Sequence, residues 1–215
     1  MFGLNPGLGR DEPLRLLLLG AHADDVEIGA GGTVLRLLDE RPNTEVTYAV
    51  FSGCETRGAE TRAAAAALLA GAAQAYVHVL SHRDGYFPFE AADIKAFAQA
   101  TLEGVRPHLV LTHRRDDVHQ DHRVIADLAW QTFRGAVIAQ YEIPKWDGDL
   151  DRPNAYVALG DEVMTRKLAI LDEHFPSQQT KGWYDAETFR GLARVRGVEA
   201  GVRYAEAFHC AKLVW

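Results

Sequence analysis

Residues 14–40 read LRLLLLGAHADDVEIGAGGTVLRLLDE, and this stretch decides the fold. The leucine-rich run at its start is apolar at nearly every position, as expected for a strand buried on both faces of a parallel sheet. A helix is expected over 26–40, ending before the sequence RPN. The turn between them contains His22, Asp24 and Asp25, which raises the question of what these polar residues do at the end of a buried strand.

Strand-like and helix-like segments alternate along the rest of the chain. Further strands are expected at 45–52, 75–80, 108–113, 136–142 and 155–159, with a last one within 205–215. Further helices are expected at 58–72, 91–105, 122–133, 161–174 and 185–196, the last ending at Gly197. This alternation predicts an α/β fold, a Rossmann-like three-layer sandwich with a mostly parallel sheet in the order 3-2-1-4-5 plus C-terminal additions.

The length of 215 residues is enough for one sizeable domain with a complete core. We therefore predict a single domain over residues 1–215. Residues 1–13 are expected to form a loose N-terminal arm. Residues 144–154, PKWDGDLDRPN, are expected to form a surface loop because the chain after them is too short for an independent core.

Composition and charge exclude several classes of protein. The chain has 23 Lys and Arg against 30 Asp and Glu, a net charge of −7, and no basic block, which argues against a nucleic-acid partner. No apolar stretch reaches the length of a membrane span, and the N-terminal segment lacks the pattern of a signal peptide. The two cysteines form no CxxC pair, which fits a reducing compartment. We expect a cytoplasmic protein without a membrane span.

Two clusters of His and Asp follow two of the expected strands. The sequence AHADD (21–25) follows the first strand, and DDVHQDH (116–122) follows the fourth. In the order 3-2-1-4-5 these strands are neighbours, and the strand order reverses between them. Open parallel sheets bind ligands at this point, beyond the carboxyl ends of the strands. The topology thus predicts that the two clusters meet.

The residue types in the clusters suit a catalytic metal. Two imidazoles and one carboxylate from His22, Asp25 and His122 would leave one position of a zinc ion open to water. The metal would lower the pKa of that water and polarise a carbonyl oxygen. Asp24 would then be the general base, and His119 the acid or the group that stabilises an oxyanion.

Two further side chains are expected to support this site without binding the metal. Asp121 is suited to accept a proton from a ring nitrogen of a ligand, and His113 ends the fourth strand beside the cluster. A purely structural alternative exists for Asp25 and Asp121, because each stands just before an expected helix, where Asp is a favoured N-cap. A dinucleotide-binding turn is a poorer match, because the glycine spacing of that motif would require a glycine where Val34 stands.

The two motifs together resemble the PIG-L/LmbE-like family of zinc-dependent N-acetylglucosaminyl deacetylases, whose motifs read A-H-P-D-D-E and H-x-D-H. This chain has AHADDVE and HQDH. The likeness extends to GGT (31–33), RGAE (57–60), RPHLVLTH (106–113), DHR (121–123), YEIP (141–144), SQ (177–178) and YAEAF (204–208). Two departures stand out: Ala23 replaces the proline of the motif, and Val26 separates the aspartate pair from Glu27.

The resemblance implies site residues and a reaction. It implies His22, Asp25 and His122 as zinc ligands, Asp24 as base, and His119 as acid or electrostatic partner. The reaction would hydrolyse the N-acetyl amide of an amino sugar or its conjugate, with protonated His119 stabilising the oxyanion. Zinc is the expected cofactor, with another divalent transition metal as the alternative. Either Asp24 or His119 would protonate the leaving nitrogen.

Substrate contacts and alternative functions are less closely specified by the sequence. The candidates for substrate binding are Arg57, His82, Arg83 and Asp84, on expected loops, and Glu206, which the resemblance places near the pocket. The expected partner is a small N-acetylated sugar, free or conjugated, and the resemblance is compatible with a homo-oligomer. The alternatives are a metallohydrolase of the same scaffold that acts on another amide or ester, and a relative that binds without catalysis.

Overall fold

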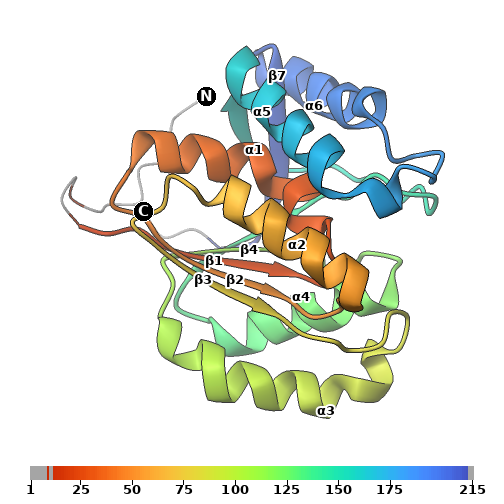
Figure 1. The fold of residues 1–215 in the computed structure, drawn as a ribbon. Helices are drawn as coiled ribbons and strands as arrows, with labels where there is room; N and C mark the ends of the chain where they lie inside the picture. The colour runs from red at the N-terminus through yellow and green to blue at the C-terminus, as the bar shows by residue number, and fades with distance from the viewer. Residues whose placement is uncertain (1–8, 10–11, 213–215) are drawn as a thin grey trace.

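The computed structural model describes residue 9 and residues 12–212, and in it seven strands form one sheet in the order β3-β2-β1-β4-β5-β7-β6 (Figure 1). Strands β1 to β5 pair in parallel, whereas β7 runs antiparallel to both β5 and β6. The strands are β1 (Arg15–Gly20), β2 (Glu45–Val50), β3 (Gln74–Val79), β4 (Leu109–Thr112), β5 (Val137–Tyr141), β6 (Ala155–Leu159) and β7 (Tyr204–Cys210). The predicted fold class and strand order are confirmed.

Helices cover both faces of the sheet. They are α1 (Asp25–Glu40), α2 (Glu55–Leu68), α3 (Phe87–Phe97), α4 (Gln120–Thr132), α5 (Asp161–His174) and α6 (Ala186–Ala200). Helices α1, α2 and α5 lie on one face, and α3 and α4 lie on the other (Figure 1). Helix α3 continues as one π-helical turn (Ala98–Leu102) and a 3-10 turn (Glu103–Val105), and a second 3-10 turn (Pro176–Gln178) follows α5.

Strand β1 lies inside the sheet, and its alternate leucines pack into two different cores. Leu16 and Leu18 are fully buried in the core under α1, α2 and α5, while Leu17 and Leu19 are fully buried in the core under α3 and α4. Successive side chains of a strand point to opposite faces, so a strand in this position has to be apolar throughout. The leucine run thereby places the following turn at the middle of the sheet edge.

Helix α1 lies unusually close to the sheet at two of its glycines. A Cβ atom at Gly29 would lie 2.3 Å from Tyr141 Cδ2, and one at Gly32 would lie 2.6 Å from Leu159 Cδ1. At Gly31, by contrast, the nearest atom would be 3.7 Å away. The absence of side chains at positions 29 and 32 therefore allows the close contact of α1 with β5 and β6.

Several element boundaries differ from the sequence-based prediction. Helix α6 runs past Gly197 to Ala200 and ends at Gly201, which has the positive φ of 71° typical of a helix C-cap. Gly197 instead meets the backbone of Arg203, where a Cβ would lie 2.4 Å from the carbonyl oxygen. Helix α2 begins three residues earlier than expected, at Glu55, and ends at Leu68.

Three further features concern the expectations on chain organisation. The predicted N-terminal arm falls largely on residues 1–8 and 10–11, outside the described residues. Residues 142–154, between β5 and β6, contain no helix or strand. Within residues 12–212, no helix has both the length and the apolar character that crossing a membrane requires.

Candidate active site

The polar cluster lies where β1 and β4 end side by side. His22 and Asp24 belong to the turn between β1 and α1, and Asp25 is the first residue of α1. His119 immediately precedes α4, and His122 lies in the first turn of α4. Because β1 pairs directly with β4, the two turns face each other across one edge of the sheet. The predicted meeting of two clusters nearly one hundred residues apart is found in the fold.

Three buried side chains direct ligand-type atoms toward one point. His22 Nδ1 lies 3.2 Å from His122 Nε2 and 3.5 Å from Asp25 Oδ2, and His122 Nε2 lies 3.6 Å from Asp25 Oδ1. The ligand atoms of these three residues all lie within 4.8 Å of one another. Two neutral imidazole nitrogens and a carboxylate are the donors found in catalytic zinc sites.

The far sides of the two imidazoles are also held by carboxylates. His122 Nδ1 lies 2.9 Å from Asp117 Oδ2, and His22 Nε2 lies 3.3 Å from Asp121 Oδ2. Such outer partners fix the orientation of a metal-binding ring. Asp121, for which the sequence suggested a supporting role, contacts the His22 ring in this way. Asp117 was not predicted for this role, because nothing in the sequence separates it from the neighbouring Asp116.

The charges of the cluster suit a bound cation. Although burial acts to raise it, the pKa of Asp25 is held well below its usual value by His113 and His122. Burial lowers the pKa of His122 to about 4. Burial also acts to lower the pKa of His22, but Asp121, Asp25 and Asp84 raise it well above its usual value. An ionised Asp25, a neutral His122 and a pocket that stabilises positive charge match what a metal ion requires.

Asp24, which precedes Asp25 in the chain, has one carboxylate oxygen paired and one unpaired. Arg57 Nη2 donates a hydrogen bond of 2.9 Å to Asp24 Oδ1. Asp24 Oδ2 is buried and has no hydrogen-bond partner among the residues that the structure describes. Burial raises the pKa of the Asp24 carboxyl above its usual value, and the Arg57 guanidinium partly offsets this. A buried carboxylate oxygen without a partner is costly, so its presence here indicates a function.

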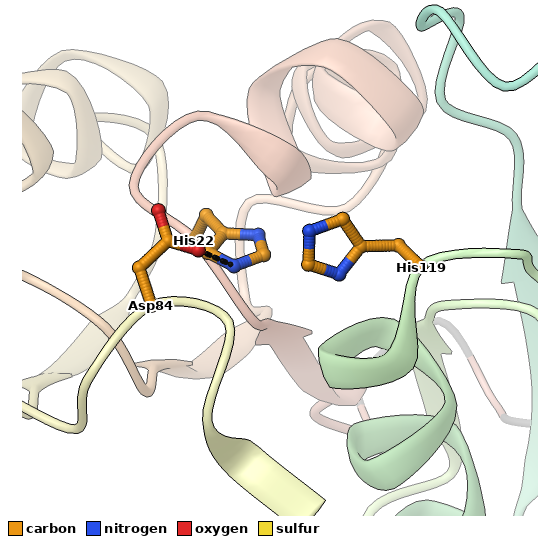
Figure 2. Close-up of side chains that lie close together, drawn as sticks. All are labelled: His22, Asp84 and His119. Atoms are coloured by element: carbon orange, nitrogen blue, oxygen red, sulfur yellow. Dashed lines mark ion pairs between the residues drawn. The ribbon is translucent and has the colours of Figure 1, made fainter.

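His119 approaches the same point from α4. It is the N-cap of α4, and its Nδ1 accepts a hydrogen bond from the backbone N–H of Asp121 at 3.2 Å. The proton of the neutral ring is therefore on Nε2. Figure 2 shows the His119 ring facing His22, with Asp84 on the other side of His22, where Asp84 Oδ1 lies 3.0 Å from His22 Nε2. Burial, followed by the His22 charge, lowers the pKa of His119, which favours this neutral form.

His113 links the cluster to the sheet. Its Nε2 accepts a hydrogen bond of 2.9 Å from the backbone N–H of Ala21 and lies 3.1 Å from Asp25 Oδ2. The hydroxyl of Tyr141 lies 3.3 Å from the same nitrogen and donates a hydrogen bond of 2.7 Å to the carbonyl of Leu19. Tyr141 was given no role from the sequence, although it begins the YEIP stretch (141–144) of the family likeness and lies at the end of an expected strand.

The predicted substrate-binding residues lie in different places. Arg57 and Asp84 are at the cluster, bonded to Asp24 and His22 as described. His82 Nδ1 lies 2.7 Å from Glu90 Oε2, and the Arg83 guanidinium stacks on Tyr86 at 3.6 Å. Glu206 is buried behind the middle of α1, where it accepts hydrogen bonds from backbone N–H groups of that helix.

Comparison with known proteins identifies the family of this chain. The family model of the GlcNAc-PI de-N-acetylases, PIG-L, matches residues 17–133, which contain every residue of the cluster. The chain belongs to the PIG-L family. The family resemblance inferred from the sequence is thereby confirmed.

Solved structures share the fold of this PIG-L family member. The N,N'-diacetylchitobiose deacetylase of Pyrococcus horikoshii is 22% identical, with a TM-score of 0.69 over 92% of this chain and 83% of that one. The conserved protein TT1542 of Thermus thermophilus is 24% identical, with a TM-score of 0.70 over 94% and 96% of the two chains. GalB, the 4-carboxy-2-hydroxymuconate hydratase of Pseudomonas putida, is 19% identical, with a TM-score of 0.70 over 94% and 98%.

These likenesses establish the fold and leave the reaction to be argued from the site. Two of the three similar chains have different activities in their names, a deacetylase and a hydratase. One fold commonly carries several chemistries. The reaction of this chain therefore follows from the side chains of its site and not from its fold.

Proposed function

We propose that this PIG-L family member is a metal-dependent hydrolase that removes the N-acetyl group from an amino sugar or its conjugate. The proposal is carried by the convergence of His22, Asp25 and His122 on one point, and by the buried, unpaired carboxylate oxygen of Asp24, the chain neighbour of Asp25. Family membership supports the deacetylase reaction, because the family model describes de-N-acetylases of N-acetylglucosamine linked to phosphatidylinositol.

The residues present fit a metal ion. His22 Nδ1, His122 Nε2 and the carboxylate of Asp25 would hold it, and zinc is the ion that this donor set favours. When bound, such an ion supplies Lewis-acid chemistry, polarising a carbonyl and making water more acidic. The carboxylates of Asp117 and Asp121 behind the two imidazoles would keep the rings in their ligand orientation.

Asp24 is the general base in this proposal. Arg57 holds Asp24 Oδ1, which leaves Oδ2 to accept a proton from the attacking water. The water oxygen forms a bond to the acetyl carbonyl carbon, and the water proton goes to Asp24. Proton transfer by a positioned side chain contributes roughly 10²–10⁴-fold to a rate.

His119 acts on the substrate side of the reaction. Because Nδ1 accepts a backbone hydrogen bond, Nε2–H is the group that can donate to the oxyanion as it forms. The C–N bond then breaks, and Asp24 passes the proton that it took from the water to the leaving nitrogen, while the neutral His119 keeps its Nε2 proton. The products are the free amine and acetate, so atoms and charges balance. The sequence suggested a protonated ring at this position, whereas a neutral ring that donates from Nε2 performs the same task.

Substrate recognition is assigned to side chains around the cluster, from the start of α2 and from the loop after β3. Arg57 and Asp84 lie against Asp24 and His22, where hydroxyls next to an acetamido group would be bound. Asp84 retains an exposed side chain and is reachable from solvent. His82 and Arg83 flank Asp84 in the chain and would extend this surface.

Acetate release from a panel of substrates tests the proposal. The panel contains N-acetylglucosamine, its β-linked dimer, and nucleotide-linked and lipid-linked conjugates, with zinc-loaded and chelator-treated protein compared side by side. We expect acetate from at least one sugar, lost with the chelator and restored by zinc. Release that is unaffected by complete metal removal, or no acetate from any member of the panel with zinc-loaded protein, would overturn the assignment.

A further inference from the structure

A buried ion pair lies behind α1, away from the cluster. Lys167 of α5 and Glu206 of β7 are both nearly inaccessible to solvent, and Lys167 Nζ lies 2.6 Å from Glu206 Oε1. Neither side chain has a part in the proposed reaction. Burying two charges is costly unless their remaining hydrogen-bonding capacity is used, so the other partners of the pair are informative.

Those partners are backbone groups of α1, at residues 28, 32 and 33. Lys167 Nζ donates to the carbonyl of Ile28 at 2.6 Å. Glu206 Oε1 accepts from the N–H of Gly32 at 2.8 Å, and Oε2 accepts from the N–H of Thr33 at 2.6 Å. In a regular helix the N–H of residue 32 donates to the carbonyl of residue 28. Lys167 therefore binds the acceptor of this helical hydrogen bond, the Ile28 carbonyl, and Glu206 binds its donor, the Gly32 N–H.

The glycine at position 32 makes this arrangement possible. A Cβ there would lie 3.0 Å from Glu206 Oε1 and 2.6 Å from Leu159 Cδ1, so any side chain would push the carboxylate away from the helix. A glycine inside a helix is itself less favourable than alanine. Helix propensity alone would favour another residue at position 32, but only glycine leaves room for the carboxylate of Glu206 to reach the backbone.

The same backbone leads directly to the cluster. Ile28, whose carbonyl binds Lys167, donates its own N–H to the carbonyl of Asp24 at 3.0 Å. Asp25 is the first residue of α1 and lies inside the helical turn that the hydrogen bond from Ile28 to Asp24 closes. We propose that Lys167 and Glu206 form a positioning pair, which fixes the first turn of α1 so that Asp25 and Asp24 face His22 and His122. The role of Asp25 and Asp24 rests on the proposed function, whereas the effect on α1 does not.

A second buried ion pair in the same region provides a matched control. Arg196 binds Glu142 through two hydrogen bonds of 2.6 and 2.8 Å. Both ion pairs line one cavity of about 20 Å³. The other hydrogen-bond partners of Arg196 in the described chain are Glu199 and the carbonyl of Asp151, and neither is in α1. Removing either cation leaves a buried carboxylate without its counter-charge, but of the two cations only Lys167 hydrogen-bonds to α1 in the described chain.

The test compares Lys167→Met, Lys167→Arg and Arg196→Met. Three quantities are measured on each full chain: the melting temperature, the zinc affinity by competition with a chelator, and the hydrogen exchange of the peptide covering residues 21–33. Glu206→Gln, which keeps the shape of the side chain and removes its charge, is measured in the same way. It provides the decisive comparison if Lys167→Met does not fold.

We expect both methionine variants to melt at lower temperature. Only Lys167→Met and Glu206→Gln should weaken zinc binding, by up to about 10-fold, because the pair acts on Asp25 through the α1 backbone and not as a direct partner of a ligand side chain. The same two should exchange faster over residues 21–33, and Lys167→Arg should restore part of both properties.

Equal zinc affinity and equal exchange in Lys167→Met and Arg196→Met would overturn the positioning role and leave a purely stabilising pair. Glu206→Gln with wild-type values for both would do the same. If the wild-type chain binds no zinc, the proposed function fails, and the exchange data still decide whether the pair holds the first turn of α1.

Discussion

Arg57 Nη2 donates a hydrogen bond of 2.9 Å to Asp24 Oδ1, and this contact accounts for only one of the two oxygens of a buried carboxylate. Arg57 belongs to the first turn of α2, whereas Asp24 precedes α1, so the contact joins two helices that follow different strands. The guanidinium sets the direction of the carboxylate and leaves Oδ2 available. In the proposed reaction this contact makes Asp24 a base and not a further metal ligand.

Replacing Arg57 with methionine should impair the base without removing it. The variant loses a charge-assisted hydrogen bond to a buried carboxylate, a contact that contributes roughly 1.5–3 kcal/mol. We expect kcat/KM for acetate release to fall by about 10-fold to 100-fold, with zinc content unchanged because Arg57 touches none of the three ligands. Steady-state kinetics and zinc analysis of the purified variant measure both quantities. Loss of zinc together with activity would contradict the assigned role of Arg57.

Asp117 and Asp116 allow a test of the carboxylate behind His122. Asp117 is buried and lies 2.9 Å from His122 Nδ1, whereas the Asp116 side chain is 69% exposed and pairs with Arg114. Asp117→Asn keeps the shape and removes the charge that orients the ring, so zinc affinity should fall by about 10-fold. Asp116→Asn should leave zinc affinity unchanged. Chelator competition measures both, and equal affinities in the two variants would refute a role for Asp117 in orienting His122.

The close contact of α1 with the sheet predicts opposite effects at two nearby glycines. Gly29→Ala would place a Cβ 2.3 Å from the Tyr141 ring, and such overpacking costs about 1–3 kcal/mol. Gly31→Ala meets no atom closer than 3.7 Å, and alanine is the better helix former by about 0.5–1 kcal/mol. Thermal unfolding should therefore show a lower melting temperature for the first variant and a slightly higher one for the second. A lower melting temperature in both would contradict the packing described here.

The sequence predicted the meeting of His22 and His122 for a physical reason. A leucine run apolar at nearly every position identified a central strand, and the alternation of strands and helices then placed the fourth strand beside the first. Every side chain at the ends of those two strands was consequently brought to one place. Strand order and the identity of the clustered residues therefore followed from periodicity and topology without any side-chain detail.

Features that depend on the contacts of individual side chains could not be predicted. The two glycines Gly197 and Gly201 both suit a helix end, and only the backbone of Arg203 against Gly197 shows why the helix continues to Ala200. Glu206 was expected near the substrate, but the antiparallel register of β7 directs it behind α1. The register of a strand added at the C-terminal side of the sheet is set by tertiary packing, which leaves no local pattern in the sequence.

The most direct test of the account is a zinc titration of the metal-stripped chain, with bound zinc and released acetate measured in the same samples for wild type, Asp24→Asn and Asp25→Asn. We predict that Asp24→Asn binds zinc as the wild type does while its rate falls by about 10²–10⁴-fold, because a base has been removed and the ligands remain. Asp25→Asn should lose zinc and activity together. An Asp24→Asn chain that keeps the wild-type rate, or that loses zinc as Asp25→Asn does, would contradict the division of these neighbouring aspartates into base and ligand.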